Sequence, residues 1–171
     1  LNTGSNIDID INGGVTTVGG LVGRLESSSS LILNSYAAGD ININGPSTNV
    51  GGIVGGLYHS ATIKNAYYGG VIATNETPVN VGNIVGFLEE GYSHLENVYY
   101  QSRTGTTVSR SYGNDSNSVG DGRINTGQHA NVNQYNGFNF AMGWNMDSSI
   151  GPVRVVVAES TAPGTTFEDE G

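Results

Sequence analysis

Hydrophobic and polar residues alternate along the first part of the chain with the period of a β-strand. Segments 8–12 (Asp-Ile-Asp-Ile-Asn) and 40–44 (Asp-Ile-Asn-Ile-Asn) place an apolar residue at every second position. A strand with one buried face requires this period, whereas an amphipathic helix repeats its apolar positions every three or four residues. Gly and Asn recur every few residues, and no apolar stripe at helical spacing runs over three turns. The pattern therefore predicts an all-β fold of short strands.

A glycine-rich block occurs three times. Val-Gly-Gly-Leu-Val-Gly begins at Val18, returns at Val50 with Ile in place of Leu, and returns at Val81 as Val-Gly-Asn-Ile-Val-Gly. Val50 follows Val18 by 32 positions, and Val81 follows Val50 by 31. A fixed period in this range is typical of proteins whose structural repeats stack on one another. Glycines are expected there because the chain turns with positive φ or because two backbones approach closely. The repeat glycines are Gly19, Gly20, Gly23, Gly51, Gly52, Gly55, Gly82 and Gly86.

Other residues recur at the same period and extend each repeat beyond its glycine block. Leu25, Leu57 and Leu88 align, and an asparagine and a tyrosine follow in every copy. In stacked strands, an aligned asparagine series forms a ladder in which each amide bonds the next, and an aligned tyrosine series stacks its rings. We expect these ladders at Asn34, Asn65, Asn97, Tyr36, Tyr67 and Tyr99.

These repeats predict a β-solenoid of about four rungs, in which aligned apolar residues stack inside. An earlier partial copy precedes the first glycine block, because Ile9 and Ile11 lie 32 residues before Ile41 and Ile43. The chain lacks an initiator methionine and starts inside a repeat. This favours a processed mature protein or a fragment of a longer one.

The chain divides into three parts. Residues 1–102 contain the repeats, and residues 158–171 are predicted to form a flexible acidic tail or linker. Residues 103–157 contain an aromatic cluster and a terminal β-branched strand. Because a solenoid exposes a strand edge and apolar core at its last rung, we expect this region to cap that end; a ligand-binding aromatic platform for sugar rings is the alternative. The cluster comprises Tyr112, Tyr135, Phe138, Phe140 and Trp144.

The wording V-G-G-L-V-G followed by N-S-Y-A-A-G resembles the GLUG repeat of bacterial surface and secreted proteins. That repeat occurs in large adhesins, in filamentous-haemagglutinin-like exoproteins and in non-catalytic parts of some IgA-cleaving peptidases. The resemblance covers about 100 of the 171 residues. It implies an extracellular, right-handed β-solenoid and carries no catalytic residues. Segments 135–140, 144–147 and 152–154 are similar to the segment that often closes such arrays.

Two positions depart from the repeat pattern. Asn83 stands where the other copies have Gly20 and Gly52, and the last copy ends at Gln101 without its glycine pair. Both departures indicate that stacking stops there and that the last repeat merges into a cap.

Composition excludes several classes of partner. The chain has 15 acidic and 6 basic residues, and its formal net charge is −9. Such a surface repels phosphate backbones and anionic lipid headgroups, so we expect neither nucleic-acid binding nor membrane association. No apolar run is long enough to span a bilayer. The absence of cysteine excludes disulfides, thiolate metal sites and cysteine nucleophiles.

Calcium is the one cofactor that the sequence brings into question. Segment 8–13 begins like an EF-hand loop, but Gly19 stands at its twelfth position, where a bidentate Glu is required. We therefore interpret Asp8 and Asp10 as outward residues of a solenoid rung. Loop 114–122 concentrates oxygen ligands outside the repeats, and its weak calcium candidates are Asp115, Asn117 and Asp121. The alternative is an ordinary loop that uses Asn, Asp and Gly for their turn geometry. We predict no bound metal.

The sequence contains no recognisable catalytic constellation. His59, His94 and His129 lack zinc-peptidase spacing, and no Gly-x-Ser-x-Gly motif occurs. Asn75 and Asn114 head glycosylation sequons by pattern alone. We therefore expect a non-catalytic, extracellular structural or adhesive module of a bacterial surface or secreted protein. Its partners would be a host or neighbouring-cell surface protein or a glycan.

Two alternatives remain open. The first is a subunit that builds an extracellular filament by strand addition at the open N-terminal rung, with further copies of itself as partners. The second is a non-catalytic stalk of a secreted peptidase or a glycan-binding β-helix.

Overall fold

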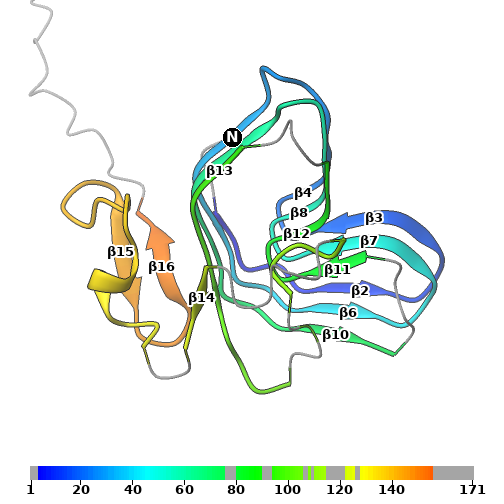
Figure 1. Ribbon diagram of the computed structural model, residues 1–171. Coiled ribbons are helices and arrows are strands. Elements are labelled where there is room, and N and C mark those ends of the chain that lie inside the picture. The colour runs from blue at the N-terminus through cyan, green and yellow to red at the C-terminus, as the bar shows by residue number, and fades with distance from the viewer. Residues whose placement is uncertain are drawn as a thin grey trace, which may run out of the picture.

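The fold was analysed in a computed structural model of the chain (Figure 1). The structure describes residues 4–75, 80–89, 94–105, 108, 110–114, 122–125 and 128–155. Within these residues it is built of β-strands, with one short 3-10 turn, η1 (Val132–Gln134), and no α-helix. The all-β fold predicted by the polar and apolar alternation is confirmed.

Each sequence repeat contributes strands to the same set of sheets. Repeat 1 comprises β1 (Gly4–Ser5), β2 (Ile9–Ile11), β3 (Val15–Gly19) and β4 (Val22–Leu25). Repeat 2 comprises β5 (Leu31–Ala37), β6 (Ile41–Ile43), β7 (Ser47–Gly51) and β8 (Val54–Leu57). Repeat 3 comprises β9 (Thr62–Tyr68), β10 (Ile72–Thr74), β11 (Asn80–Gly82) and β12 (Val85–Leu88). The remaining strands are β13 (His94–Gln101), β14 (Arg123–Ile124), β15 (Trp144–Asp147) and β16 (Gly151–Arg154).

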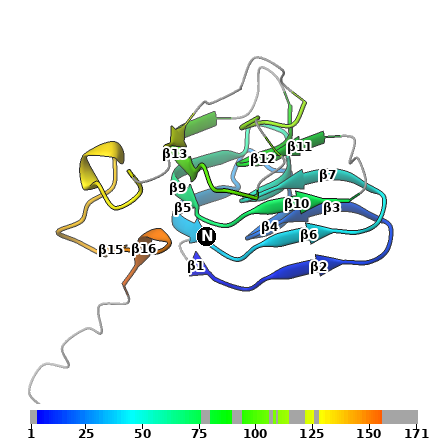
Figure 2. The ribbon, with the colours of Figure 1, turned by 90° about the horizontal axis from the view of Figure 1, so that it is seen from below.

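Corresponding strands pair in parallel, and residues one period apart lie directly opposite each other. Three sheets have the orders β10-β6-β2, β11-β7-β3 and β12-β8-β4, and a fourth has the order β1-β5-β9-β13-β14. Ile41, for example, pairs with both Ile9 and Ile72. Figure 2 shows these strands lying one above another. The structure is therefore solenoid-like, as the repeat period predicts.

The core lies between the sheets and is filled by aligned aliphatic residues. A column of isoleucines from β6 and β10 and the apolar residues that flank the glycine block are fully buried. Burying a side chain of this size stabilises the fold by about 1.5–3 kcal/mol. The aliphatic residues with no exposed surface include Ile32, Ile41, Ile43, Ile53, Val54, Leu57, Ile63, Ile72 and Ile84.

The first glycine of each block is required by close backbone approach. A Cβ added to Gly19, Gly51 or Gly82 would overlap the carbonyl oxygen three residues ahead. None of these glycines is among the residues with positive φ. Of the two reasons that the sequence suggests for these glycines, the structure thus supports the steric one.

The asparagine series marks a sharp bend in each strand of the five-stranded sheet. Asn34, Asn65 and Asn97 have φ values of 48°, 51° and 52°, in the left-handed region that Asn tolerates better than most residues. The bend reverses which alternate residues face inward. Ile32 points into the core before the bend, and Ser35 and Ala37 are buried after it. Consequently Tyr36 and its counterparts point outward, although strict alternation from Ile32 would direct them inward.

Repeat 2 contains a shortened turn that explains the change of period from 32 to 31 residues. Ile63 follows Leu57 by six positions, whereas Ile32 follows Leu25 by seven. The shorter turn is closed by a hydrogen bond of 3.1 Å from Ala61 N to Tyr58 O. Its two central residues, His59 and Ser60, have φ values of 52° and 61°. This left-handed pair has the geometry of a type I′ turn, which usually contains Gly or Asn.

Stacking continues past the predicted boundary at residue 102. Ile84 N donates to Ser111 O at 2.9 Å, and β14 pairs with β13. The side chain of Asn83 is buried, and its Nδ2 donates to Val108 O and Arg110 O at 3.1 and 3.0 Å. The departure at Asn83 is therefore a connection to the next segment, and the prediction that stacking stops there is wrong.

The aromatic cluster does not cover the end of the stack. Residues 128–155, here called the lateral layer, lie beside β5, β9 and β13 (Figures 1 and 2). Their buried aromatics form a second core with Tyr67 and Ile124, whereas Tyr112 packs against the main core instead. The outward-pointing tyrosines form an apolar surface on the side of the sheet, and the aromatic residues of the lateral layer pack against this surface. The buried aromatics of the lateral layer are Tyr135, Phe138 and Trp144.

Candidate functional site

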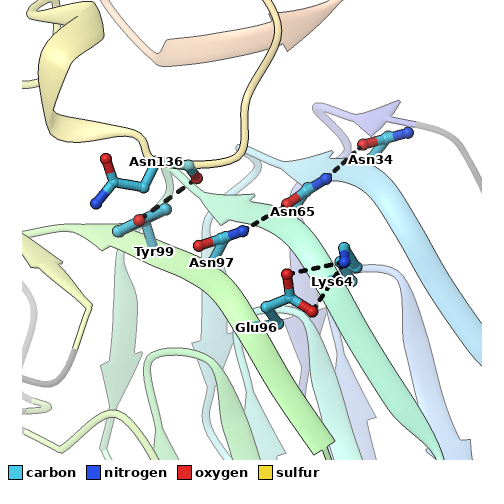
Figure 3. A network of polar contacts seen from close by, with 7 residues as sticks. All are labelled: Asn34, Lys64, Asn65, Glu96, Asn97, Tyr99 and Asn136. Atoms are coloured by element: carbon cyan, nitrogen blue, oxygen red, sulfur yellow. Dashed lines mark hydrogen bonds and ion pairs between the residues drawn. The ribbon is translucent and has the colours of Figure 1, made fainter.

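Side-chain amides form a continuous ladder on the five-stranded sheet (Figure 3). Asn65 Nδ2 donates to Asn34 Oδ1 at 3.1 Å, and Asn97 Nδ2 donates to Asn65 Oδ1 at 3.0 Å. The asparagine ladder predicted from the sequence is thus present. Each donor belongs to the later repeat and each acceptor to the earlier one, so the ladder has a direction.

The same direction holds for a second ladder, on the sheet of β2, β6 and β10 and the turns that follow. Asn44 Nδ2 donates to Asn12 Oδ1 at 3.1 Å, and Asn75 Nδ2 donates to Asn44 Oδ1 at 2.5 Å. Asn42 Nδ2 donates to Asp10 Oδ1 at 2.8 Å. Because an ionised carboxylate only accepts hydrogen bonds, the direction of the Asp10–Asn42 bond is fixed by chemistry.

Asp8 and Asp40 use their carboxylates to bind backbone. Asp8 Oδ1 accepts from Asp40 N at 2.8 Å, and Asp40 Oδ1 accepts from Val71 N at 2.8 Å. Each carboxylate therefore supports the start of the neighbouring strand in the next repeat. The acidic residues of segments 8–12 and 40–44 thus have structural partners: Asp10 lies in β2, and Asp8 and Asp40 directly precede β2 and β6.

The first repeat leaves one side of the stack open among the described residues. β2, β3 and β4 are the edge strands of their sheets. Ile9 and Ile11 are only half-buried, whereas their counterparts Ile41 and Ile43 have no exposed surface. Ile7, in the loop before β2, is 74% exposed. We call this surface, formed by residues 7–12 with β3 and β4, the open face.

Backbone groups at the open face point outward. Ile9 N donates to Asp40 O at 2.8 Å, and Ile11 O accepts from Asn44 N at 2.7 Å, so these residues pair with the β6 side. Successive backbone amides in a strand point to opposite edges. The N–H and C=O of Asp10 therefore face away from β6.

The tyrosine series lies in register but does not stack ring on ring. Tyr36 pairs with Tyr67 and Tyr67 with Tyr99 along the backbone. Their described ring contacts are instead with the lateral layer. Tyr135 contacts Tyr67 and Tyr99 edge to face, at 5.6 Å and interplanar angles of 88° and 87°. Gly137 lies against the amides of Asn65 and Asn97, which leaves no room for a side chain.

The burial of the aromatic rings in the lateral layer is inconsistent with the ligand-binding platform for sugar rings that was considered from the sequence. Trp144 is 3% exposed, stacks on Phe138 at 4.3 Å and has the Arg154 guanidinium 5.2 Å from its ring. Burial also raises the pKa of Tyr135 to about 12, and raises the pKa of Tyr67 further. These aromatic residues therefore serve as packing groups.

The sequence analysis missed one half-buried aromatic group, formed by Tyr58 and Phe87. Tyr58 stacks on Phe87 at 5.2 Å, and the Arg24 guanidinium lies 4.6 Å from the Tyr58 ring. The ring occupies the space above Gly56, which pairs with both Arg24 and Phe87. These residues occupy variable positions of the repeat, so their residue types do not recur from copy to copy. Only their register, which places them opposite one another in neighbouring strands, could have identified the group from the sequence.

The structure contains no candidate metal centre in the part of the chain that it describes, where no three metal-binding side chains converge. The weak calcium candidates Asp115, Asn117 and Asp121 lie outside the described residues. No helix in the described ranges is both long and apolar enough to cross a bilayer.

Comparison with protein-family models, with curated proteins and with solved structures found no match to this chain.

Proposed function

We propose that this chain is a non-catalytic structural or adhesive module of a secreted or surface-exposed bacterial protein. Its role is to hold a polar outer surface rigidly in place. The supporting observation is the pair of directional amide ladders, which lock the outer face of one repeat to the next. The resemblance of the glycine block to GLUG repeats supports the extracellular setting.

The proposal includes the finer form of the fold. The stack corresponds to a β-solenoid of about four rungs, because three sheets contain three strands each and the fourth contains five. A right hand follows from the GLUG resemblance and from the strong preference of parallel β connections for that hand.

The non-catalytic role is tested on the purified chain with panels of glycan and peptide substrates. We expect no turnover, because the carboxylates of Asp8, Asp10 and Asp40 support neighbouring strands or amides. Turnover that disappears in the folded triple variant D8N/D10N/D40N would refute the proposal. Adhesion is tested with chain-coated beads on arrays of matrix proteins and cell-surface glycans, with heat-unfolded chain as control. Binding that is equal for folded and unfolded chain would also count against it.

Self-assembly by strand addition is a second candidate function. It is favoured by the open face, where apolar residues that are fully buried in repeat 2 remain half-exposed in repeat 1. Sedimentation velocity and electron microscopy over a wide concentration range test it. Filaments are the expected result, and a monomer at every concentration excludes it.

A further inference from the structure

His129 joins two parts of the lateral layer. Its Nε2 lies 2.7 Å from the backbone oxygen of Ser148, in the turn between β15 and β16. Its own backbone oxygen accepts from the hydroxyl of Tyr135 at 2.8 Å, and the Tyr135 ring packs on Tyr67 and Tyr99. One residue therefore links the loop before η1 to the hairpin and to the aromatic core of the layer.

The contact with Ser148 fixes the protonation of the imidazole ring. A carbonyl oxygen only accepts hydrogen bonds, so Nε2 carries the proton of the neutral ring and Nδ1 carries none. Nδ1 of His129 is buried and has no hydrogen-bond partner among the described residues. The closed layer thus accommodates the neutral ring, whereas a charged ring would place an N–H where no acceptor receives it. An unpaired buried donor is costly, because it has left water without a replacement.

The charged and titratable groups on the neighbouring segments supply no acceptor for Nδ1 of His129. Asp147 begins the hairpin turn, and its Oδ1 already accepts hydrogen bonds within that turn. The Arg103 guanidinium donates to a backbone oxygen of the same turn, and the preceding strand β14 carries a second cation, Arg123. Tyr135 stays neutral, because burial raises its pKa to about 12. A charged imidazole would therefore gain a neighbouring cation and no hydrogen-bond partner.

The lateral layer is the part of the described chain that is expected to open most easily. Its regular structure is a two-stranded sheet, β15 with β16, and a two-stranded sheet is marginal without packing against other elements. Trp144 Nε1 is also buried without a hydrogen-bond partner among the described residues, so the layer already contains one unpaired donor. Units of this kind open locally while the rest of the protein stays folded.

We propose that His129 makes the closure of the lateral layer dependent on pH. Histidine in water takes up a proton near about pH 6.5, and the charged ring favours an open layer in which Nδ1 can bond to water. The layer is therefore most stable above this pH and loses stability as the pH falls below it. Opening uncovers Tyr67 and the amides of Asn65 and Asn97, against which Gly137 lies. This inference goes beyond the proposed function, because it does not depend on whether the chain adheres to a surface.

The test is native-state hydrogen exchange of the full chain, followed by NMR at about pH 7.5 and about pH 5.5 and corrected for the intrinsic rate at each pH. The amides of Phe138 and Val155 are bonded within the layer, and their protection factors should fall at least about fivefold at the lower pH. Those of Ile41 and Ile53, which are bonded within the stack, should not change. Equal protection of the layer at both pH values overturns the proposal.

Variants assign the effect to His129. In His129→Gln, the side-chain amide can still donate to the same backbone oxygen but takes up no proton, so protection should be equal at both pH values. His59→Gln and His94→Gln remove the other two histidines, which lie outside the layer, and should keep the acid response. Asp147 stays ionised in this range, because hydrogen bonds from the side chain and backbone of Ser149 lower the pKa of its carboxyl. An acid response that persists in folded H129Q overturns the proposal.

Nitrogen-15 spectra of the imidazole ring give a readout that needs no variant. At neutral pH they should show the tautomer of His129 with the proton on Nε2, and a proton on Nδ1 at neutral pH overturns the proposal. The adhesion and turnover assays of the proposed function are run at neutral pH, where the layer is closed. Failure of this inference therefore leaves the proposed function standing, and failure of those assays leaves this inference standing.

Discussion

The direction of the asparagine ladder predicts that chemically identical substitutions at its two ends have opposite consequences. Asn34 uses its side-chain oxygen as an acceptor, and Asn97 uses its nitrogen as a donor. Replacing an asparagine by aspartate keeps the size and the tolerance of positive φ but removes the donor. Asn34→Asp therefore retains its bond from Asn65, whereas Asn97→Asp turns a hydrogen bond into a contact between two oxygens.

The magnitudes follow from ordinary hydrogen-bond energies. Loss of the Asn97 bond costs about 1 kcal/mol, and repulsion between a partly buried carboxylate and the Asn65 oxygen adds about another 1 kcal/mol. In Asn34→Asp, a charge-assisted bond replaces a neutral one, so the free energy of unfolding should stay within about 0.5 kcal/mol of the original or rise. Asp10, which accepts from Asn42 at 2.8 Å, already shows an acid at an acceptor position.

Urea denaturation followed by circular dichroism and Trp144 fluorescence measures the difference. At neutral pH, Asn97→Asp should be less stable than Asn34→Asp by about 2 kcal/mol, or a melting temperature lower by about 4–8 °C. The difference should shrink below about pH 4, because protonation restores a donor at position 97 and weakens the charged acceptor at position 34. Equal destabilisation by both variants would refute a ladder with a fixed direction.

Three further predictions concern the turns, the glycines and the tyrosines. Ser60→Gly should raise the free energy of unfolding by about 1 kcal/mol, because φ is 61° there, whereas Ser29→Gly, in the longer turn of repeat 1, should give no gain in melting temperature. Gly51→Ala should lower the free energy of unfolding by at least about 3 kcal/mol, because the added Cβ would overlap backbone atoms. Gly23→Ala should be tolerated, because the atom nearest to the added Cβ is 3.5 Å away. The urea denaturation midpoints of the two variants test this difference. Burial raises the pKa of Tyr135 to about 12. The free energy of unfolding should therefore be constant below about pH 10, where the tyrosine of the unfolded chain is protonated, and should fall as the pH rises from there to 12. A flat profile of stability at alkaline pH contradicts this reasoning.

The repeat period predicts which residues lie opposite one another, because stacked parallel strands convert a sequence period into spatial register. Ile41 pairs with Ile9 and Ile72 for this reason, and the amide of Asn65 meets its neighbours on both sides. These features depend only on spacing and residue type, and both are visible in the sequence.

The direction in which a side chain points is harder to predict than its register. Alternation from Ile32 places Asn34 and Tyr36 on the inward face, but the left-handed conformation of Asn34 shifts the phase and turns Tyr36 outward. This shift moves the aromatic cluster from the end of the stack to its side. Asn tolerates positive φ without requiring it, so the shift depends on packing that the sequence pattern does not encode.

The lateral layer also changes how the protein should respond to tension. The hydrogen bonds between repeats run along the stacking direction, so pulling along that direction would separate repeats one after another. Tyr135 contacts both Tyr67 and Tyr99, and Gly137 lies across Asn65 and Asn97. These contacts bridge the neighbouring strands β9 and β13, so separating the two strands also requires breaking their contacts with the lateral layer. A tensile load on the stack is thereby shared between the sheet and its side layer, and mechanical failure should require the aromatic contacts and the amide ladder to break at once.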